Sequence, residues 1–193
     1  MVGTLLKPAP DTPQALGLIF RALAFAAQKH SGQRREDAEK TPYINHPLAL
    51  ADVLINEGGI TDAETLCAAL LHDTLEDTET TAEELRQHFG DNITRLVQEV
   101  SDDKSLHWRT RKRLQIEHAP HLSQKAQCIK LADKICNLRD LVVSPPPAWS
   151  PKRRREYLEW ANTVISAIRA ASPALAEQFD RIYAQRMRPD LGY

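Results

Sequence analysis

The sequence predicts an all-α fold of about eight or nine helices. Helix-start signals recur along the 193 residues, each with a capping side chain ahead of a proline or a glutamate. Apolar residues keep helical spacing, most clearly in the single buried stripe formed by Ile93, Leu96, Val97 and Val100. No stretch alternates apolar and polar residues for long enough to form a strand, and no internal repeat is present.

The composition is that of an ordinary globular domain. With 193 residues, 42% hydrophobic and 26% charged, the chain is long enough to bury a substantial core. We therefore expect one domain over residues 1–193, with a core from about 12 to 186. The 25 Lys and Arg residues balance 26 Asp and Glu residues, so no overall field attracts nucleic acid or membrane, and neither is expected as a partner.

The cysteines and the N-terminus indicate the cytoplasm. Cys67, Cys128 and Cys136 lie in apolar helical surroundings without C-x-x-C spacing, which is typical of buried free thiols in a reducing compartment. The first 13 residues hold no apolar signal segment, and no apolar run reaches membrane-spanning length. The sequence leaves the oligomeric state open.

The first predicted helix begins at Asp11-Thr12-Pro13, where a cap precedes a first-turn proline, and it continues through Ala27. Its apolar residues run nearly all round the helix, so we expect it at the centre of the core. It ends at Ser31-Gly32, and the charged segment from 33 to 40 is predicted to be a solvated loop. His30 is interpreted as a histidine at the C-terminus of this helix.

Four start signals define the next helices. Pro47 opens a helix that runs to Glu57 and ends at Gly58-Gly59, which places His46 at a helix N-terminus. Thr61 with Glu64 forms a capping box for an Ala- and Leu-rich helix that ends at His72-Asp73. A second box, Thr81 with Glu84, starts a helix that ends at Phe89-Gly90, after which Asp91 caps another.

The second half of the chain has one polar stretch and three further helices. Residues 101–120 turn polar, and the basic cluster around Trp108 is interpreted as a solvated face rather than a nucleic-acid surface. Residues 123–141 form a helix with a polar stripe on one side. Ser150-Pro151 and Ser172-Pro173 each pair a cap with a first-turn proline and open the two final amphipathic helices, while Trp149 is expected to pack the proline-rich segment before them.

The densest chemistry lies where the third predicted helix ends. His72, Asp73, Glu76 and Asp77 place one imidazole and three carboxylates within six residues. Adjacent residues on a helix point about 100° apart, so His72 and Asp73 can share an ion only off the helix end. A metal-dependent hydrolase needs imidazole and carboxylate ligands with a free carboxylate close by to accept a proton from water.

His46 and Asp133 complete a set of metal-ligand candidates from separate helices. Two imidazoles and two carboxylates without a thiolate suit a five- or six-coordinate ion such as Mn²⁺, Fe²⁺ or Mg²⁺, whereas a closed structural zinc site is disfavoured.

These residues carry a family resemblance. His46, His72-Asp73 and Asp133 match the H…HD…D pattern of the HD superfamily of metal-dependent phosphohydrolases. The strings Thr-Pro-Tyr-Ile-Asn-His-Pro at 41–47, Ala-Leu-Leu-His-Asp-Thr-Leu-Glu-Asp-Thr at 69–78 and Lys-Leu-Ala-Asp-Lys-Ile-Cys-Asn-Leu-Arg-Asp at 130–140 resemble the hydrolase domain of RelA/SpoT-type alarmone enzymes, above all the small alarmone hydrolases. The resemblance covers the chain from about Ala15 to the last helix, with no synthetase region following.

The resemblance implies a compact HD-domain bundle that hydrolyses the 3′-diphosphate of ppGpp or pppGpp to pyrophosphate and GDP or GTP. It implies a Mn²⁺ cofactor held by His46, His72, Asp73 and Asp133, with Glu76 and Asp77 as the catalytic acidic pair. The residues that the resemblance suggests for the nucleotide site are Arg35, Asn137, Lys104, Lys130 and Tyr157.

One position departs from the family and two other functions stay open. Family members usually have a second basic residue directly after the position of Arg35, and here it is Glu36, so strict preference for guanine is uncertain. The first alternative is another HD phosphohydrolase, a 5′-nucleotidase or an NADPH phosphatase. The second is a non-catalytic nucleotide-binding HD domain, which would need no water-activating carboxylate.

Overall fold

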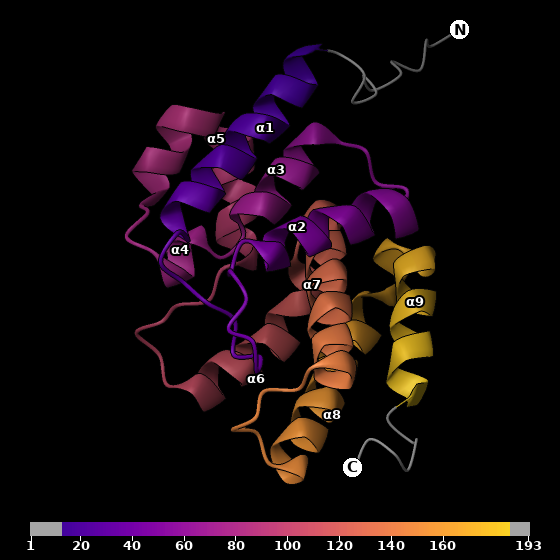
Figure 1. Cartoon of the computed structure of the whole chain (residues 1–193). Coiled ribbons are helices and arrows are strands. Elements are labelled where there is room, and N and C mark those ends of the chain that lie inside the picture. Colours follow the sequence, from indigo (N-terminus) through magenta and orange to yellow (C-terminus); the bar gives the residue numbers. More distant parts are fainter. Residues whose placement is uncertain (1–12, 186–193) are drawn as a thin grey trace, which may run out of the picture.

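The structure is a computed structural model that describes residues 13–185, and these form an all-α bundle (Figure 1). The helices are α1 (Pro13–Lys29), α2 (Asn45–Asp52), α3 (Ala63–Leu71), α4 (Thr74–Asp77), α5 (Ala82–Val100), α6 (Trp108–His118), α7 (Gln124–Val143), α8 (Pro151–Ile168) and α9 (Pro173–Ala184). This agrees with the expected fold class and with eight or nine helices, if the one-turn α4 is counted. Within the described residues the only strand-like pairing is an isolated bridge between Arg34 and Pro42.

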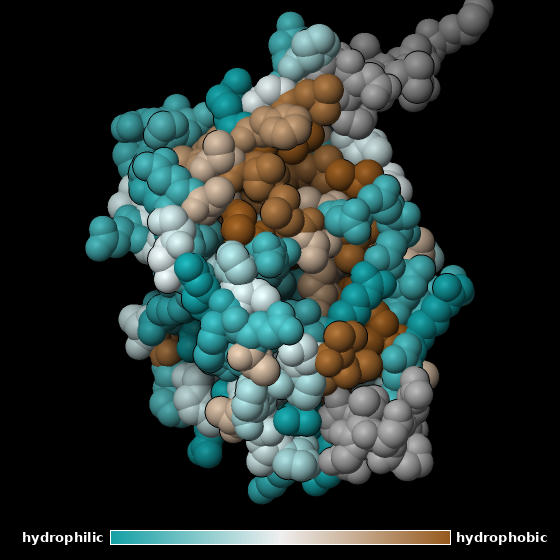
Figure 2. All heavy atoms as spheres, viewed as in Figure 1, coloured by the Kyte–Doolittle hydropathy of each residue, from teal (hydrophilic) through white to brown (hydrophobic). Residues whose placement is uncertain are grey.

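The core is built on α3 and α7 rather than on α1. All residues of α3 from Thr65 to Leu71 are buried, and α7 packs against α2, α3, α5, α8 and α9. In α1 only Ala22 and Ala26 are buried, while Phe20 is 66% exposed. The prediction of a central first helix is therefore wrong: α1 packs along one face against α3 and leaves a brown apolar surface over its outer side (Figures 1 and 2).

The predicted helix ends agree with the structure in part. Thr81, Ser150 and Ser172 cap α5, α8 and α9 through their hydroxyl oxygens, as predicted. The Thr61–Glu64 capping box is wrong, because Asp62 is the N-cap of α3 and accepts a hydrogen bond from Thr65 N. The predicted start at Asp11-Thr12 lies outside the described residues.

The backbone departs from regular α-helix at two places, one directly after α2 and one inside α5. After α2 the chain continues as a π-helical segment, Val53–Glu57, and Gly59 then takes a φ of +63°. Gly90 has a φ of +79° and kinks α5, so the predicted break between two helices is present. The Asp91 carboxylate accepts a hydrogen bond from Arg86 Nε, and no capping bond to it is recorded.

Helix α6 was not predicted, because its residues are too polar to show an apolar stripe. It has no buried residue and is attached through aromatic contacts, in which Lys112 lies 4.7 Å from the Trp160 ring centroid. The three cysteines are buried free thiols, as expected. Among residues 13–185, no helix combines the length and the apolar character that crossing a membrane requires.

Candidate metal and active site

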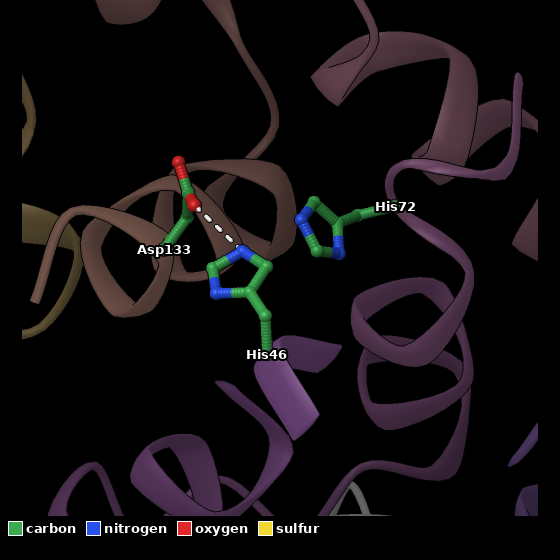
Figure 3. Close-up of side chains that lie close together, drawn as sticks. All are labelled: His46, His72 and Asp133. Atoms are coloured by element: carbon green, nitrogen blue, oxygen red, sulfur yellow. Dashed lines mark ion pairs between the residues drawn. The ribbon is translucent and has the colours of Figure 1, made fainter. Parts of the chain in front are cut away.

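Three helices bring two imidazoles and a carboxylate to one point. His46 lies in the first turn of α2, His72 directly follows α3, and Asp133 lies in the middle of α7 (Figure 3). One potential ligand atom from each residue lies within 4.8 Å of the other two, and His46 Nε2 is 3.3 Å from Asp133 Oδ1. Residues 87 positions apart in the sequence therefore share one small polar cavity of about 200 Å³.

The His72 imidazole is oriented as a metal ligand. His72 Nδ1 lies 2.8 Å from the Ala69 carbonyl oxygen, so this nitrogen carries the proton in the neutral ring and Nε2 keeps its lone pair. Nε2 is buried and has no hydrogen-bond partner, although Asp73 Oδ2 lies only 2.8 Å away. A buried nitrogen without a partner is costly, and two ligand atoms at this separation can contact one ion.

Asp73 lies beside this trio. Its Oδ2 is 3.9 Å from His46 Nε2, and it accepts a short hydrogen bond from the Tyr43 hydroxyl. Burial opposes ionisation of Asp73, but the neighbouring His72 and His46 hold its pKa below the usual range. The structure therefore places an ionised carboxylate next to both imidazoles, while its role as the fourth ligand stays a prediction.

The charges around the trio favour a bound cation. Burial lowers the pKa of His72, but Asp73 outweighs this effect and raises the pKa to about 9. Asp133 pairs with the buried Lys134 at 2.7 Å, and its pKa lies well below the ordinary value because Lys134 and the histidines outweigh the effect of burial. The His72 imidazole thus gains a proton where no metal is present. A divalent ion would replace this positive charge, and the donor set of two nitrogens and carboxylate oxygens fits such an ion.

Glu76 and Asp77 occupy different surroundings although they are adjacent. Glu76 lines the cavity of the trio and accepts a hydrogen bond from Asp102 N at 2.7 Å. Burial raises its pKa to about 7, as expected for a carboxylate that can accept a proton near neutral pH. Asp77 instead pairs with Lys104 and lines a second, larger cavity.

The second cavity has a volume of about 550 Å³ and is more open. Arg35, Tyr43 and Asn137 line both cavities, so the two adjoin each other at these side chains. Arg35 donates to Asp140 and, at 3.3 Å, to Asn137 Oδ1, while Asn137 Nδ2 donates to Asp133 Oδ1 at 2.7 Å. The predicted nucleotide residues Arg35, Asn137 and Tyr157 therefore lie together in a space of ordinary ligand-pocket size.

The two predicted lysines lie apart from each other. Lys130 lines the small cavity and donates to the Val100 carbonyl oxygen at 2.5 Å, and burial lowers its pKa. Lys104 comes from the loop before α6 and reaches the site only through Asp77.

Four contributors were not identified from the sequence. Tyr43 contacts Asp73, Lys134 neutralises Asp133, and both lie inside the strings that carry the family resemblance. Gln33 donates to the Asp77 carbonyl oxygen, and Trp149 lines the larger cavity, but neither has a sequence signal. His30, interpreted only as a helix-end histidine, is buried and stacks at 4.9 Å on Tyr43.

Comparison with known proteins gives consistent matches. Residues 22–162 match the model of an HD domain. The chain is 55% identical to the guanosine-3′,5′-bis(diphosphate) 3′-pyrophosphohydrolase MESH1 of Xenopus tropicalis, over 86% of this chain and 93% of that protein. It is 51% identical to the protein of the same name from Homo sapiens, over 87% and 94% respectively. A solved structure described as a metazoan ortholog of SpoT that hydrolyzes ppGpp superposes with a TM-score of 0.86 at 45% identity, covering 88% of this chain and 96% of that one.

Proposed function

The chain belongs to the HD-domain family and, within it, to the guanosine-3′,5′-bis(diphosphate) 3′-pyrophosphohydrolases, and from this membership we propose that it hydrolyses ppGpp and pppGpp. The products are pyrophosphate and GDP or GTP. The strongest support is that the chain is 55% and 51% identical to two relatives of that name over nearly their whole length. The cluster of His46, His72 and Asp133 lies within the residues that match the HD-domain model.

The reaction requires water to attack the phosphorus attached to the 3′ oxygen, after which that oxygen leaves and gains a proton. A bound divalent ion would neutralise phosphate charge and lower the pKa of water at the site. We assign proton removal from the attacking water to Glu76, because it lines the metal cavity and its pKa is near 7.

The remaining residues position the polyanion. Asp77 orients Lys104 through their ion pair, and the Lys104 and Lys130 ammonium groups offset phosphate charge. Arg35, Asn137 and Tyr157 hold the nucleoside in the larger cavity, which adjoins the metal cavity. With Asp73 as fourth ligand, the site offers two imidazoles and two carboxylates, and we propose Mn²⁺ as the ion because this donor set suits it.

The test is product analysis after incubation with ppGpp and Mn²⁺. Equimolar GDP and pyrophosphate are expected, and incubation with ATP and GDP should give no ppGpp. Release of orthophosphate instead would contradict the proposal and favour a phosphatase. We further propose a cytoplasmic location, supported by the three buried free thiols.

A further inference from the structure

Glu36, where the family usually has a basic residue, lies on an ordered turn. The segment between α1 and α2 is held by hydrogen bonds from Arg35 N to Thr41 O at 2.9 Å and from Thr41 N to Asp37 Oδ1 at 3.0 Å. From this turn Glu36 reaches Trp149, 113 residues later, whose indole Nε1 donates to Glu36 Oε2 at 3.1 Å. The carboxylate is thereby fixed at the wall of the larger cavity.

The Trp149 side chain is held in place by two residues of α8. The Arg153 guanidinium lies 4.2 Å from its ring centroid, and its ring is 5.5 Å from that of Tyr157. Arg153 and Tyr157 both lie in α8. The Trp149 indole is therefore positioned by residues other than those of the turn that carries Glu36.

Among the described residues that line this cavity, Glu36 is the carboxylate engaged by a single neutral donor, the Trp149 indole. Four carboxylates line it, and three have strong partners: Asp37 binds Thr41, Asp77 pairs with Lys104, and Asp140 pairs with Arg35. Glu36 Oε1 accepts no hydrogen bond from any residue in the range 13–185, and Oε2 has one lone pair left.

We propose that Glu36 selects guanine by accepting hydrogen bonds from N1–H and from the 2-amino group, one on each carboxylate oxygen. This inference rests on the proposed function and names the base-reading group of the same site. Guanine presents these two donors side by side, hypoxanthine keeps only N1–H, and adenine presents an acceptor at N1. A carboxylate accepts two parallel donors strongly and repels an acceptor, so in this protein Glu36 favours guanine over hypoxanthine and adenine.

The experiment compares three nucleotides on four proteins. Titration calorimetry gives Kd for GDP, IDP and ADP, and steady-state kinetics gives kcat/KM for the corresponding 3′-diphosphates. The wild type should prefer guanine over hypoxanthine by about 10-fold and over adenine by about 100-fold. In Glu36→Gln, which keeps the size but not the charge, both ratios should fall to within about threefold.

Two further variants separate base reading from structure. Trp149→Phe keeps a ring beneath Arg153 but removes the indole N–H, so it should reduce the guanine preference only in part. Glu39→Gln changes an exposed carboxylate of the same loop that lines no described cavity and should leave both ratios unchanged.

The outcomes are distinguishable. Unchanged ratios in Glu36→Gln, or equal losses on all three bases, would show that Glu36 only supports Trp149 and overturn the inference. Because the Kd ratios need no turnover, a wild type that prefers GDP but releases no pyrophosphate from ppGpp would overturn the proposed function alone.

Discussion

The two adjoining cavities differ in how their side chains are held. In the smaller one, His46 and Lys134 lie in helices and His72 directly follows α3, and each is less than a tenth exposed. In the larger one, Arg35 and Glu36 come from a loop and Trp149 from the segment between α7 and α8. A charge change in the buried cavity would leave an unpaired ion, whereas at an exposed wall it costs little. The chemistry is therefore fixed by the core, while specificity can vary, as Glu36 illustrates.

The largest effect should come from removing the metal or its charged ligand. Asp73→Asn replaces a carboxylate with an amide, a poorer ligand for a hard dication, so metal and activity should be lost together. We expect a decrease of roughly 10³–10⁵-fold in kcat, as after chelation of the wild type. Chelation should also lower the Tm, because an ion that binds only the native state stabilises it. Metal analysis with activity checks this, and full activity of metal-free protein would contradict it.

Glu76→Gln should separate catalysis from metal binding inside the same cavity. The shape and the acceptor for Asp102 N remain, so metal content should stay unchanged while kcat falls by roughly 10²–10⁴-fold with little change in KM. Metal analysis beside steady-state kinetics is the measurement. If this variant loses its metal, or keeps a near-normal kcat, Asp77 becomes the candidate for the water-activating carboxylate.

The same variant tests the raised pKa of Glu76 without turnover. Burial raises this pKa from 4.5 to about 7. Between these two values the unfolded chain loses the proton more readily than the folded one, so the free energy of unfolding falls as the pH rises. Metal-free Glu76→Gln should therefore be more stable than metal-free wild type at pH 8, by on the order of 2 kcal/mol, and the difference should vanish near pH 4. Denaturant unfolding at both pH values measures it, and equal stabilities at pH 8 would contradict the pKa.

The difference between the cavities also explains what the sequence could predict. The sequence placed His46 near a helix start, His72 at a helix end and Asp133 on the polar side of a helix, and the family resemblance predicted that they meet at one ion. The failure at α1 has a different cause: most of its residues are apolar, including those on its solvent side, and the packing against α3 decides which of them are buried.

The residues that line the larger cavity show no such pattern in the sequence. Glu36 and Trp149 meet across 113 residues through a side-chain hydrogen bond, and no periodicity encodes such a contact. Helix α6 was missed because its residues show no apolar stripe: it is attached by Lys112 contacts with Trp160 and by the partly buried Ile116. The family resemblance supplied Arg35 and Asn137, while the spacing of residues alone would have left them as surface groups.

A smaller effect is expected where the two cavities join. Arg35→Lys keeps the charge but loses the planar fork that contacts Asp140 and Asn137 and stacks at 5.6 Å on Tyr43. KM for ppGpp should rise about 10-fold while kcat changes little, because the lost contacts bind substrate and transition state alike. Arg155→Lys, at an exposed position on α8, is the matched control. A fall in kcat with constant KM would instead place Arg35 at the reacting phosphate.

The smallest effect should come from the Tyr157 hydroxyl. The ring is packed between Trp149 at 5.5 Å and Trp160 at 5.3 Å, and burial raises its pKa to about 12, so it stays a neutral donor. Its hydroxyl makes no recorded hydrogen bond with the described residues, although the side chain lines the larger cavity. Tyr157→Phe keeps the packing, so the Tm should not change. If the hydroxyl binds ribose or phosphate, KM should rise about three- to tenfold, the worth of one hydrogen bond. An unchanged KM with an unchanged Tm would assign Tyr157 to packing alone, and only Arg35 and Asn137 would then remain as predicted nucleoside contacts.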